Sequence, residues 1–189
     1  MIALANPDAA AETIGYWACT GDPACKISYG ESVERGTMAV VRQVHKMHES
    51  CPETQFVLVG FGQGGQIMDN ALCGGGDPMV GFTNNTVQIS DSAVKMIKAA
   101  IFFGNLRAQY GLPYQVGSCR SGGIDPRPAG FVCPHADKIQ SYCDASDAYC
   151  CTGNNLTAIQ GYTDAHGQEA VKFVTSKLSA NNTRCATKR

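Results

Sequence analysis

Apolar residues recur at three- and four-residue spacing over residues 32–51, and this spacing predicts an amphipathic helix that ends before Pro52. The next apolar segment, residues 55–61, is short and continuous, which is typical of a strand buried on both faces of a sheet. A tight glycine-rich turn is predicted at residues 62–65, and helical spacing resumes over residues 66–73. This part of the chain therefore predicts a helix, a buried strand, a tight turn and a second helix in succession.

A second helix and strand are predicted over residues 92–98 and 99–104. Residues 105–134 are rich in glycine and proline and predict a long loop. A further strand is expected at residues 138–142, and a closing amphipathic helix at residues 164–178. Because buried strands alternate with helices, the pattern predicts an α/β three-layer sandwich around a mainly parallel sheet.

The composition excludes several classes of protein. The chain has 189 residues, of which 44% are hydrophobic and 16% charged, and it shows no internal repeat or linker, so we expect a single domain over residues 1–189. A formal net charge of −1 excludes strong electrostatic binding to nucleic acid or to anionic lipid. No apolar run approaches the ~20 residues of a membrane span. We therefore expect a monomer with neither a nucleic-acid partner nor a membrane partner.

The chain carries ten cysteines, scattered along its whole length. An even count of this kind fits five disulfides formed in an oxidising compartment. No metal site is expected from them, because clustered cysteine pairs followed by histidines do not occur. Three Asn-x-Ser/Thr sequons, at Asn84, Asn155 and Asn181, agree with secretion by a eukaryote. Residues 1–7 lack the basic and apolar regions of a signal peptide, so we expect a secreted, extracellular protein whose signal peptide is not present in this chain.

The predicted turn after the first strand has the layout of a nucleophile elbow. Gly60, Gly62 and Gly64 alternate with other residues between the predicted strand and the predicted helix. The middle residue of an elbow must carry a hydroxyl or thiol to attack an ester, and Gly62 has no side chain. A phosphate-binding loop is the less favoured interpretation, because the Lys-Ser/Thr of a P-loop is missing and the glycine spacing does not fit G-x-G-x-x-G.

Seven stretches share a distinctive sequence with one family of enzymes: VLVGF (57–61), QGG (63–65), IMD (67–69), ALCGGGDP (71–78), RPAGF (127–131), YCDASD (142–147) and YCC (149–151). With them, the chain from about residue 11 to residue 178 resembles fungal acetylxylan esterases of the cutinase-like carbohydrate esterase family five. The resemblance implies a secreted serine esterase with an α/β-hydrolase-like, cutinase-like fold. It also implies a Ser, Asp, His triad in that chain order, acetylated xylan or another plant cell-wall polysaccharide as partner, and no metal or cofactor.

The resemblance places the family's catalytic positions on four residues of this chain. The nucleophile position is Gly62 and the base position is Ile159, so both catalytic side chains are lost, whereas the acid position, Asp147, is retained. The backbone N–H of Gln63 takes the position of one oxyanion-hole donor. The first strand of the family, with the loop that supplies the other donor, is expected to be missing.

The resemblance also implies a disulfide pattern. The expected pairs are Cys19–Cys25, Cys73–Cys133, Cys119–Cys151 and Cys143–Cys150. Cys51 and Cys185 remain, and they either pair with each other or leave Cys51 without a partner.

Other residues have both a catalytic and a structural interpretation. His166 could replace the lost base only if its ring reached back about two turns, so an exposed helix histidine is the favoured interpretation. His45 and His48 have the spacing of a metal pair, but no carboxylate or cysteine is evident nearby, and a solvated helix face is favoured. Asp147 no longer has a histidine to orient, so we expect it to accept backbone N–H bonds within the loop between Cys143 and Cys150.

Three functions follow from these residues. The favoured hypothesis is a catalytically inactive acetylxylan-esterase-like protein, a pseudoenzyme, which binds plant cell-wall polysaccharide. The first alternative is an active serine carboxylesterase that deacetylates xylan, or a cutinase-type ester hydrolase. The second alternative is a fungal effector or interaction protein without enzymatic activity.

Overall fold

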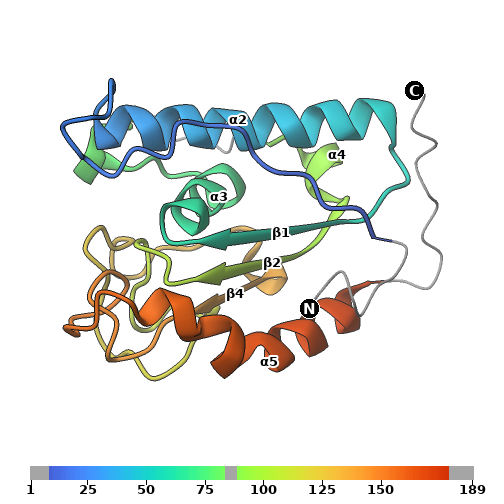
Figure 1. The fold of residues 1–189 in the computed structure, drawn as a ribbon. Helices are drawn as coiled ribbons and strands as arrows, with labels where there is room; N and C mark the ends of the chain where they lie inside the picture. Colours follow the sequence, from blue (N-terminus) through green and yellow to red (C-terminus); the bar gives the residue numbers. More distant parts are fainter. Residues whose placement is uncertain (1–8, 84–88, 179–189) are drawn as a thin grey trace.

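The computed structural model describes residues 9–83 and 89–178, and its centre is a parallel sheet of four strands in the order β1-β2-β4-β3. The strands are β1 (Phe56–Phe61), β2 (Ile97–Phe103), β3 (Gln115–Val116) and β4 (Ile139–Tyr142). Helices α2 (Tyr29–Ser50) and α3 (Gln63–Cys73) cover one face of the sheet, and α5 (Tyr162–Lys177) covers the other (Figure 1). The expected three-layer α/β fold with a parallel sheet is confirmed.

Two apolar clusters hold the three layers together, one on each face of the sheet. On the first face, Leu58 of β1 packs with Ile67 of α3 and Val40 of α2. On the second face, Ile101 of β2 packs in one cluster with Val174 of α5. The continuous apolar run of β2 is explained by this arrangement, because successive side chains point to opposite faces and both faces are covered.

The boundaries of several predicted elements shift. Helix α2 begins earlier than predicted, because the Ser28 hydroxyl caps it by accepting a hydrogen bond from the N–H of Glu31 (3.1 Å). The predicted helix at residues 92–98 is wrong in extent, since α4 covers only Asp91–Val94. The carbonyl of Met96 accepts the N–H of Phe56 (2.8 Å), so the chain has already joined the sheet at this point.

The predicted long loop at residues 105–134 contains β3, which pairs with β4 in parallel register. Three short 3-10 helices complete the described chain: η1 (Pro78–Val80), η2 (Ala136–Lys138) and η3 (Ala158–Gly161). No helix of residues 9–83 and 89–178 is long and apolar enough to cross a membrane.

Disulfides tie the loops to the core. The structure contains Cys19–Cys25, Cys73–Cys133, Cys119–Cys151 and Cys143–Cys150, which are the four pairs that the resemblance implied. The remaining expected pair involves Cys185, which lies outside the described residues.

Candidate functional site

The turn between β1 and α3 is a sharp elbow centred on Gly62. This glycine has φ +51° and ψ −119°, a conformation that residues with a side chain rarely adopt. Its N–H donates to the carbonyl of Phe103 (2.9 Å), and its carbonyl accepts the N–H of Gln66 (3.1 Å). A Cβ on Gly60 would lie 2.5 Å from the carbonyl oxygen of Gly64, so this crowded turn requires glycine there as well. The predicted elbow geometry is present, although α3 already begins at Gln63.

The three expected triad positions converge at this elbow. A Cβ on Gly62 would lie 3.1 Å from the Cδ1 atom of Ile159. A Cβ on Gly104, at the end of β2, would lie 3.3 Å from both Ile159 Cδ1 and Asp147 Oδ2. Ile159 therefore stands between the elbow and Asp147. The fold brings together a glycine, an isoleucine and a carboxylate at the three positions that the resemblance assigned to nucleophile, base and acid.

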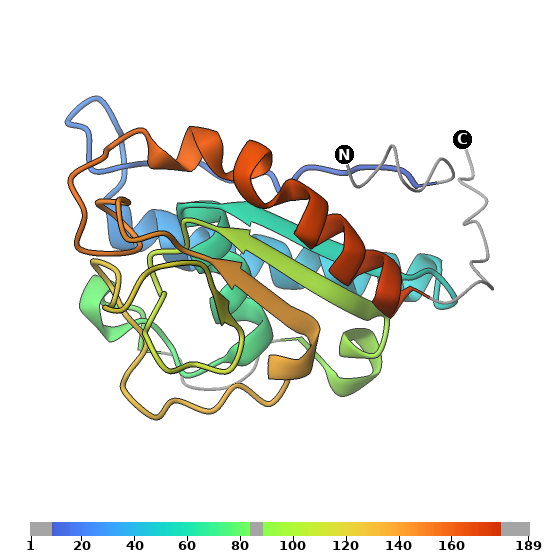
Figure 2. The ribbon, with the colours of Figure 1, turned by 90° about the horizontal axis from the view of Figure 1, so that it is seen from below.

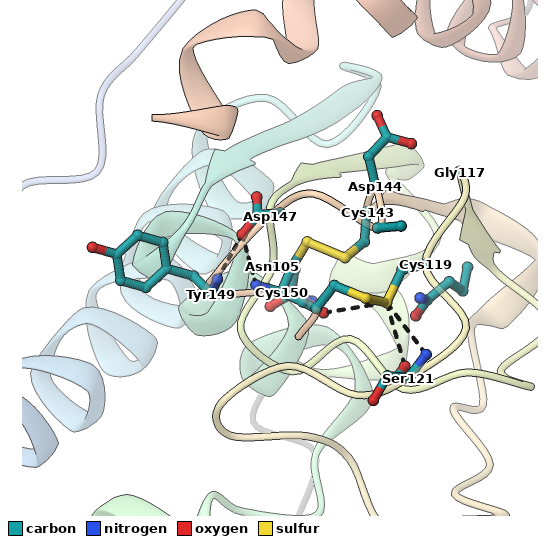
Figure 3. The surroundings of a disulfide bond; sticks show 12 residues. Asn105, Gly117, Cys119, Ser121, Cys143, Asp144, Asp147, Tyr149 and Cys150 are labelled. Carbon is teal, nitrogen blue, oxygen red and sulfur yellow. Dashed lines mark hydrogen bonds between the residues drawn. A yellow bond between two sulfur atoms is a disulfide. The ribbon is translucent and has the colours of Figure 1, made fainter. Parts of the chain in front are cut away.

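The carboxylate of Asp147 is fully engaged in holding its own loop. It is 1% exposed, and its Oδ1 accepts the N–H groups of Tyr149 (2.7 Å) and Cys150 (2.9 Å), as the dashed lines of Figure 3 show beside the disulfide. Its Oδ2 accepts the hydroxyl of Tyr162 (3.1 Å), and burial raises the pKa of that hydroxyl, so it keeps its proton. The expected structural role, in which the carboxylate accepts backbone N–H bonds, is confirmed by these contacts.

Gln63 connects the elbow to the loop closed by Cys19 and Cys25. As the first residue of α3, its backbone N–H has no partner inside the helix and remains a candidate oxyanion donor. Its side-chain Nε2 donates to the carbonyl of Cys19 (2.9 Å), and its Oε1 accepts the hydroxyl of Ser32 (3.2 Å). The side chain thus has a structural role that the sequence did not indicate.

A buried network of charges lies behind α3. Arg127 donates to Asp69 Oδ1 (2.7 Å), and both side chains are 0% exposed. Arg107 pairs with Asp77 (2.7 Å) and with Asp125 (3.2 Å), so one guanidinium faces two carboxylates. Burial raises the pKa of Asp125 to about 7, and the neighbouring Asp77 also raises it, while Arg107 opposes the shift. The network joins parts of the chain that are distant in sequence, and no local pattern predicts it.

A second polar cluster, at the end of β4, corrects the interpretation of His166 as an exposed helix histidine. Its Nε2 lies 2.7 Å from Asp144 Oδ2, and its ring packs against Tyr142 and Tyr162. The hydroxyl of Ser118 donates to the other oxygen of Asp144 (3.0 Å). Burial opposes ionisation of Asp144, but the hydrogen bonds from His166 and Ser118 outweigh it and lower the pKa of this carboxyl.

We expected His45 and His48 on a solvated face of α2, and the structure corrects this. Both rings contact the segment around α4. His45 Nε2 accepts the N–H of Ser90 (3.0 Å), and His48 Nδ1 lies 2.9 Å from the sulfur of Met96. Each imidazole thus has its own partner, and the two do not share a ligand. Their role in the described structure is to attach α2 to the neighbouring segment.

Among residues 9–83 and 89–178, a grouping with metal-ligand spacing occurs at Cys119, Cys143 and Cys151. All three sulfurs belong to disulfides, so none is available as a thiolate ligand. This grouping therefore does not indicate a metal site.

One of the three candidate glycosylation sites lies within the described chain. Asn155 is exposed, and its Oδ1 accepts both the N–H and the hydroxyl of Thr157 (3.0 Å each). Asn84 and Asn181 lie outside the described residues. Glycosylation at any of the three stays a prediction.

Comparison with known proteins gives consistent matches over most of the chain. The family model described as Cutinase matches residues 3–178. An acetylxylan esterase of Hypocrea jecorina is 52% identical over 185 residues, covering 97% of this chain and 61% of the relative. Acetylxylan esterase 2 of Talaromyces purpureogenus is 55% identical over 175 residues, covering 92% of this chain and 75% of the relative. The chain thus spans about three-fifths of the length of the first of these relatives.

The fold also matches a solved structure. The catalytic core domain of acetyl xylan esterase from Trichoderma reesei superimposes with a TM-score of 0.86 at 55% sequence identity. The match covers 88% of this chain and 82% of that chain.

Proposed function

The chain belongs to the cutinase family, and on that premise we propose that it is a secreted, acetylxylan-esterase-like protein that binds acetylated plant cell-wall polysaccharide without hydrolysing it. The observation that carries the proposal is the contact between the elbow and η3. Gly62 offers no hydroxyl, and Ile159 fills the adjacent space at 3.1 Å from the position of the missing Cβ. Removal of triad members from a serine hydrolase lowers its rate on the order of 10⁴- to 10⁶-fold.

The polysaccharide part of the proposal is supported by the names of the relatives and by exposed apolar side chains near the elbow. Phe61 directly precedes Gly62 and is 43% exposed, and Tyr149, two residues after Asp147 in the same loop, is 40% exposed. Exposed aromatic rings provide flat apolar surfaces at ligand sites. The disulfides within the described chain support an extracellular location, since such bonds persist in oxidising compartments.

An active ester hydrolase is the second candidate, and the names of the relatives favour it. At identities of 52% and 55%, both relatives are called acetylxylan esterases. This candidate needs a nucleophile elsewhere, and Ser118, Asp144 and His166 provide the right residue types. In that cluster the carboxylate lies between the hydroxyl and the imidazole, with each bonded to a different carboxylate oxygen. A serine nucleophile is activated by a hydrogen bond to its histidine base. In this cluster the Ser118 hydroxyl and the His166 imidazole are each bonded to Asp144 instead.

Activity assays separate the two candidates. We would measure acetate release from p-nitrophenyl acetate and from acetylated xylan by the natural chain and by a Gly62→Ser/Ile159→His double variant. The matched control is Gly62→Ala/Ile159→His, which regains the imidazole but not the hydroxyl. We expect neither the natural chain nor the control to release acetate. Turnover by the natural chain, lost on Ser118→Ala, would instead support the active esterase with a displaced nucleophile.

Binding assays test the other half of the proposal. We would measure co-sedimentation of the natural chain with insoluble acetylated xylan, chemically deacetylated xylan and cellulose. Comparison of the two xylans reports a preference for acetyl groups, and comparison with cellulose reports a preference for the sugar chain. We expect retention by acetylated xylan, and weaker retention when Phe61 is replaced by Ala. Equal failure to bind all three polymers would reject the polysaccharide ligand and favour the interaction-protein alternative.

A further inference from the structure

The segment between β4 and α5 contains the sequon Asn155-Leu156-Thr157. Figure 2 shows this segment, in orange, as a loop at the end of the sheet to which the strand arrows point. Asn155 and Thr157 are exposed, and the side chain between them, Leu156, is 64% exposed. The sequon therefore lies at the surface, where the fold leaves room for a bulky substituent.

The side-chain amide of Asn155 has one bonded atom and one free atom. Its Oδ1 accepts both the N–H and the hydroxyl of Thr157 (3.0 Å each). Its Nδ2 makes no hydrogen bond within residues 9–83 and 89–178. An N-linked glycan replaces one hydrogen of this nitrogen and leaves the carbonyl oxygen as an acceptor. The turn can therefore carry a glycan without losing either of its bonds.

The main chain of Asn155 lies beside two of the three positions that converge at the elbow. Its carbonyl accepts the N–H groups of Ala148 (3.4 Å) and Ala158 (3.4 Å). Ala148 directly follows Asp147, and Ala158 directly precedes Ile159. Four residues of chain span at most about 14 Å, so a group attached to Asn155 starts close to Ile159.

We propose that Asn155 carries an N-linked oligosaccharide and that this glycan partly covers the approach to the elbow. The inference rests on the proposed secretion and polysaccharide binding. The donor is an oligosaccharide linked to a lipid diphosphate, the donor class of the secretory pathway. A bond forms between Nδ2 of Asn155 and C1 of the first sugar, the bond from C1 to the lipid diphosphate breaks, and Nδ2 releases one proton.

A glycan at this position affects long ligands more than short ones. It is bulky and hydrated, and the bonds to Thr157 hold its attachment point at the start of η3. A polysaccharide chain that approaches Ile159 must pass the glycan, whereas a short oligosaccharide can avoid it. We therefore expect the glycan to weaken binding of the polymer and to leave binding of short oligosaccharides unchanged.

Glycopeptide mass spectrometry tests the modification itself. The full chain would be secreted by a yeast, digested, and analysed with and without endoglycosidase treatment. We expect the peptide that contains Asn155 to carry a glycan, and we expect Asn155→Gln and Thr157→Ala to remove it. The matched control is Asn154→Gln, at the adjacent exposed asparagine, which belongs to no sequon and should leave the glycan in place. An unmodified Asn155 peptide from the secreted chain would overturn the proposal.

Binding to insoluble acetylated xylan tests the effect on the elbow. We would compare Asn155→Gln and Thr157→Ala with Asn154→Gln from the same host, so that glycans at other sequons stay in place. The two variants without the glycan should bind the polymer at least about threefold more tightly, and all three should bind acetylated xylotriose equally. Because Thr157→Ala keeps Asn155, agreement between the two variants assigns the change to the glycan and not to the asparagine side chain.

Two results would contradict the proposal in distinguishable ways. Equal affinity for the polymer with and without the glycan would show that the glycan does not cover the elbow. If no form bound the polymer or the oligosaccharide, the polysaccharide ligand would be rejected, and this effect of the glycan with it. The glycopeptide masses would still decide whether Asn155 is modified.

Discussion

The Cδ1 atom of Ile159 lies 3.1 Å from the point where a Cβ on Gly62 would be. Carbon atoms pack best at about 3.5–4.0 Å, so this separation is too short for a relaxed contact. Ile159 therefore occupies space that an elbow side chain would need, and the missing side chain at residue 62 makes room for the isoleucine. Gly62 and Ile159 therefore fit each other, and a larger side chain at residue 62 requires Ile159 to move.

This coupling gives a stability prediction. Gly62→Ala should destabilise the chain by about 1–3 kcal/mol, because the backbone at +51° is strained for a residue with a side chain and the new methyl group meets Ile159. Ile159→Ala removes the second part of that cost, so the double variant should be more stable than the sum of the single effects. Urea unfolding of the four proteins in a double-mutant cycle measures the coupling. Strict additivity would show that the contact does not constrain residue 62.

Asp147 gives a second prediction, because its carboxylate is a structural acceptor for three donors. Asp147→Ala should cost about 3 kcal/mol of unfolding free energy, since buried N–H groups lose a charged acceptor. The matched control is Asp164→Ala at an exposed position of α5, which should change stability by less than about 0.5 kcal/mol. Equal effects of the two substitutions on thermal and urea unfolding would contradict the structural role.

The elbow and the layers around it could be predicted from the sequence because their signals are local. The apolar run of β1, the glycines at 60, 62 and 64, and the helical spacing of α3 are adjacent in the chain. The resemblance then placed Gly62, Asp147 and Ile159 at one site, and the described contacts bring them together.

The remaining polar contacts could not be predicted, because they join residues with no local pattern. His166 pairs with Asp144, 22 positions earlier, and Arg127 pairs with Asp69, 58 positions earlier. The end of the short helix α4 was missed for a related reason. The carbonyl of Met96 accepts the N–H of Phe56, the first residue of β1. Pairing within the sheet therefore overrides the helical spacing of residues 92–98.

The Arg127–Asp69 pair is expected to be essential for folding. Arg127 also donates to the carbonyl oxygens of Gly74 (2.6 Å) and Asp69 (3.1 Å), so it fixes the end of α3. Arg127→Ala leaves a buried carboxylate uncompensated and should cost about 3–5 kcal/mol. Arg35→Ala, which breaks the exposed pair with Glu31 on α2, is the control and should cost less than about 0.5 kcal/mol. A comparable loss in both variants, measured by urea unfolding, would argue against a special role for the buried pair.

Asp125 makes stability depend on pH. Burial raises its pKa in the folded chain to about 7, and Asp77 adds to the shift despite Arg107. In the unfolded chain an aspartate titrates near pH ~3.9. A raised pKa means that the folded chain binds the proton more tightly, so this contribution to stability is complete below about pH 4 and is lost as pH rises through about 7.

Asp125→Asn removes the titrating group and keeps one side-chain oxygen, which can accept either from the Arg107 guanidinium at the place of Oδ1 (3.2 Å) or from the amide of Gln66 at the place of Oδ2 (2.7 Å), but not from both. We expect the free energy of unfolding of the natural chain to fall between about pH 4 and pH 7, and we expect this decline to be shallower in the variant. Urea unfolding at fixed ionic strength across this range measures both slopes. Asp91→Asn, at the exposed start of α4, controls for the loss of a carboxylate as such and should keep the slope of the natural chain. Parallel slopes for the natural chain and Asp125→Asn would show that Asp125 does not titrate in this window, and that the cluster around Arg107 keeps both carboxylates ionised.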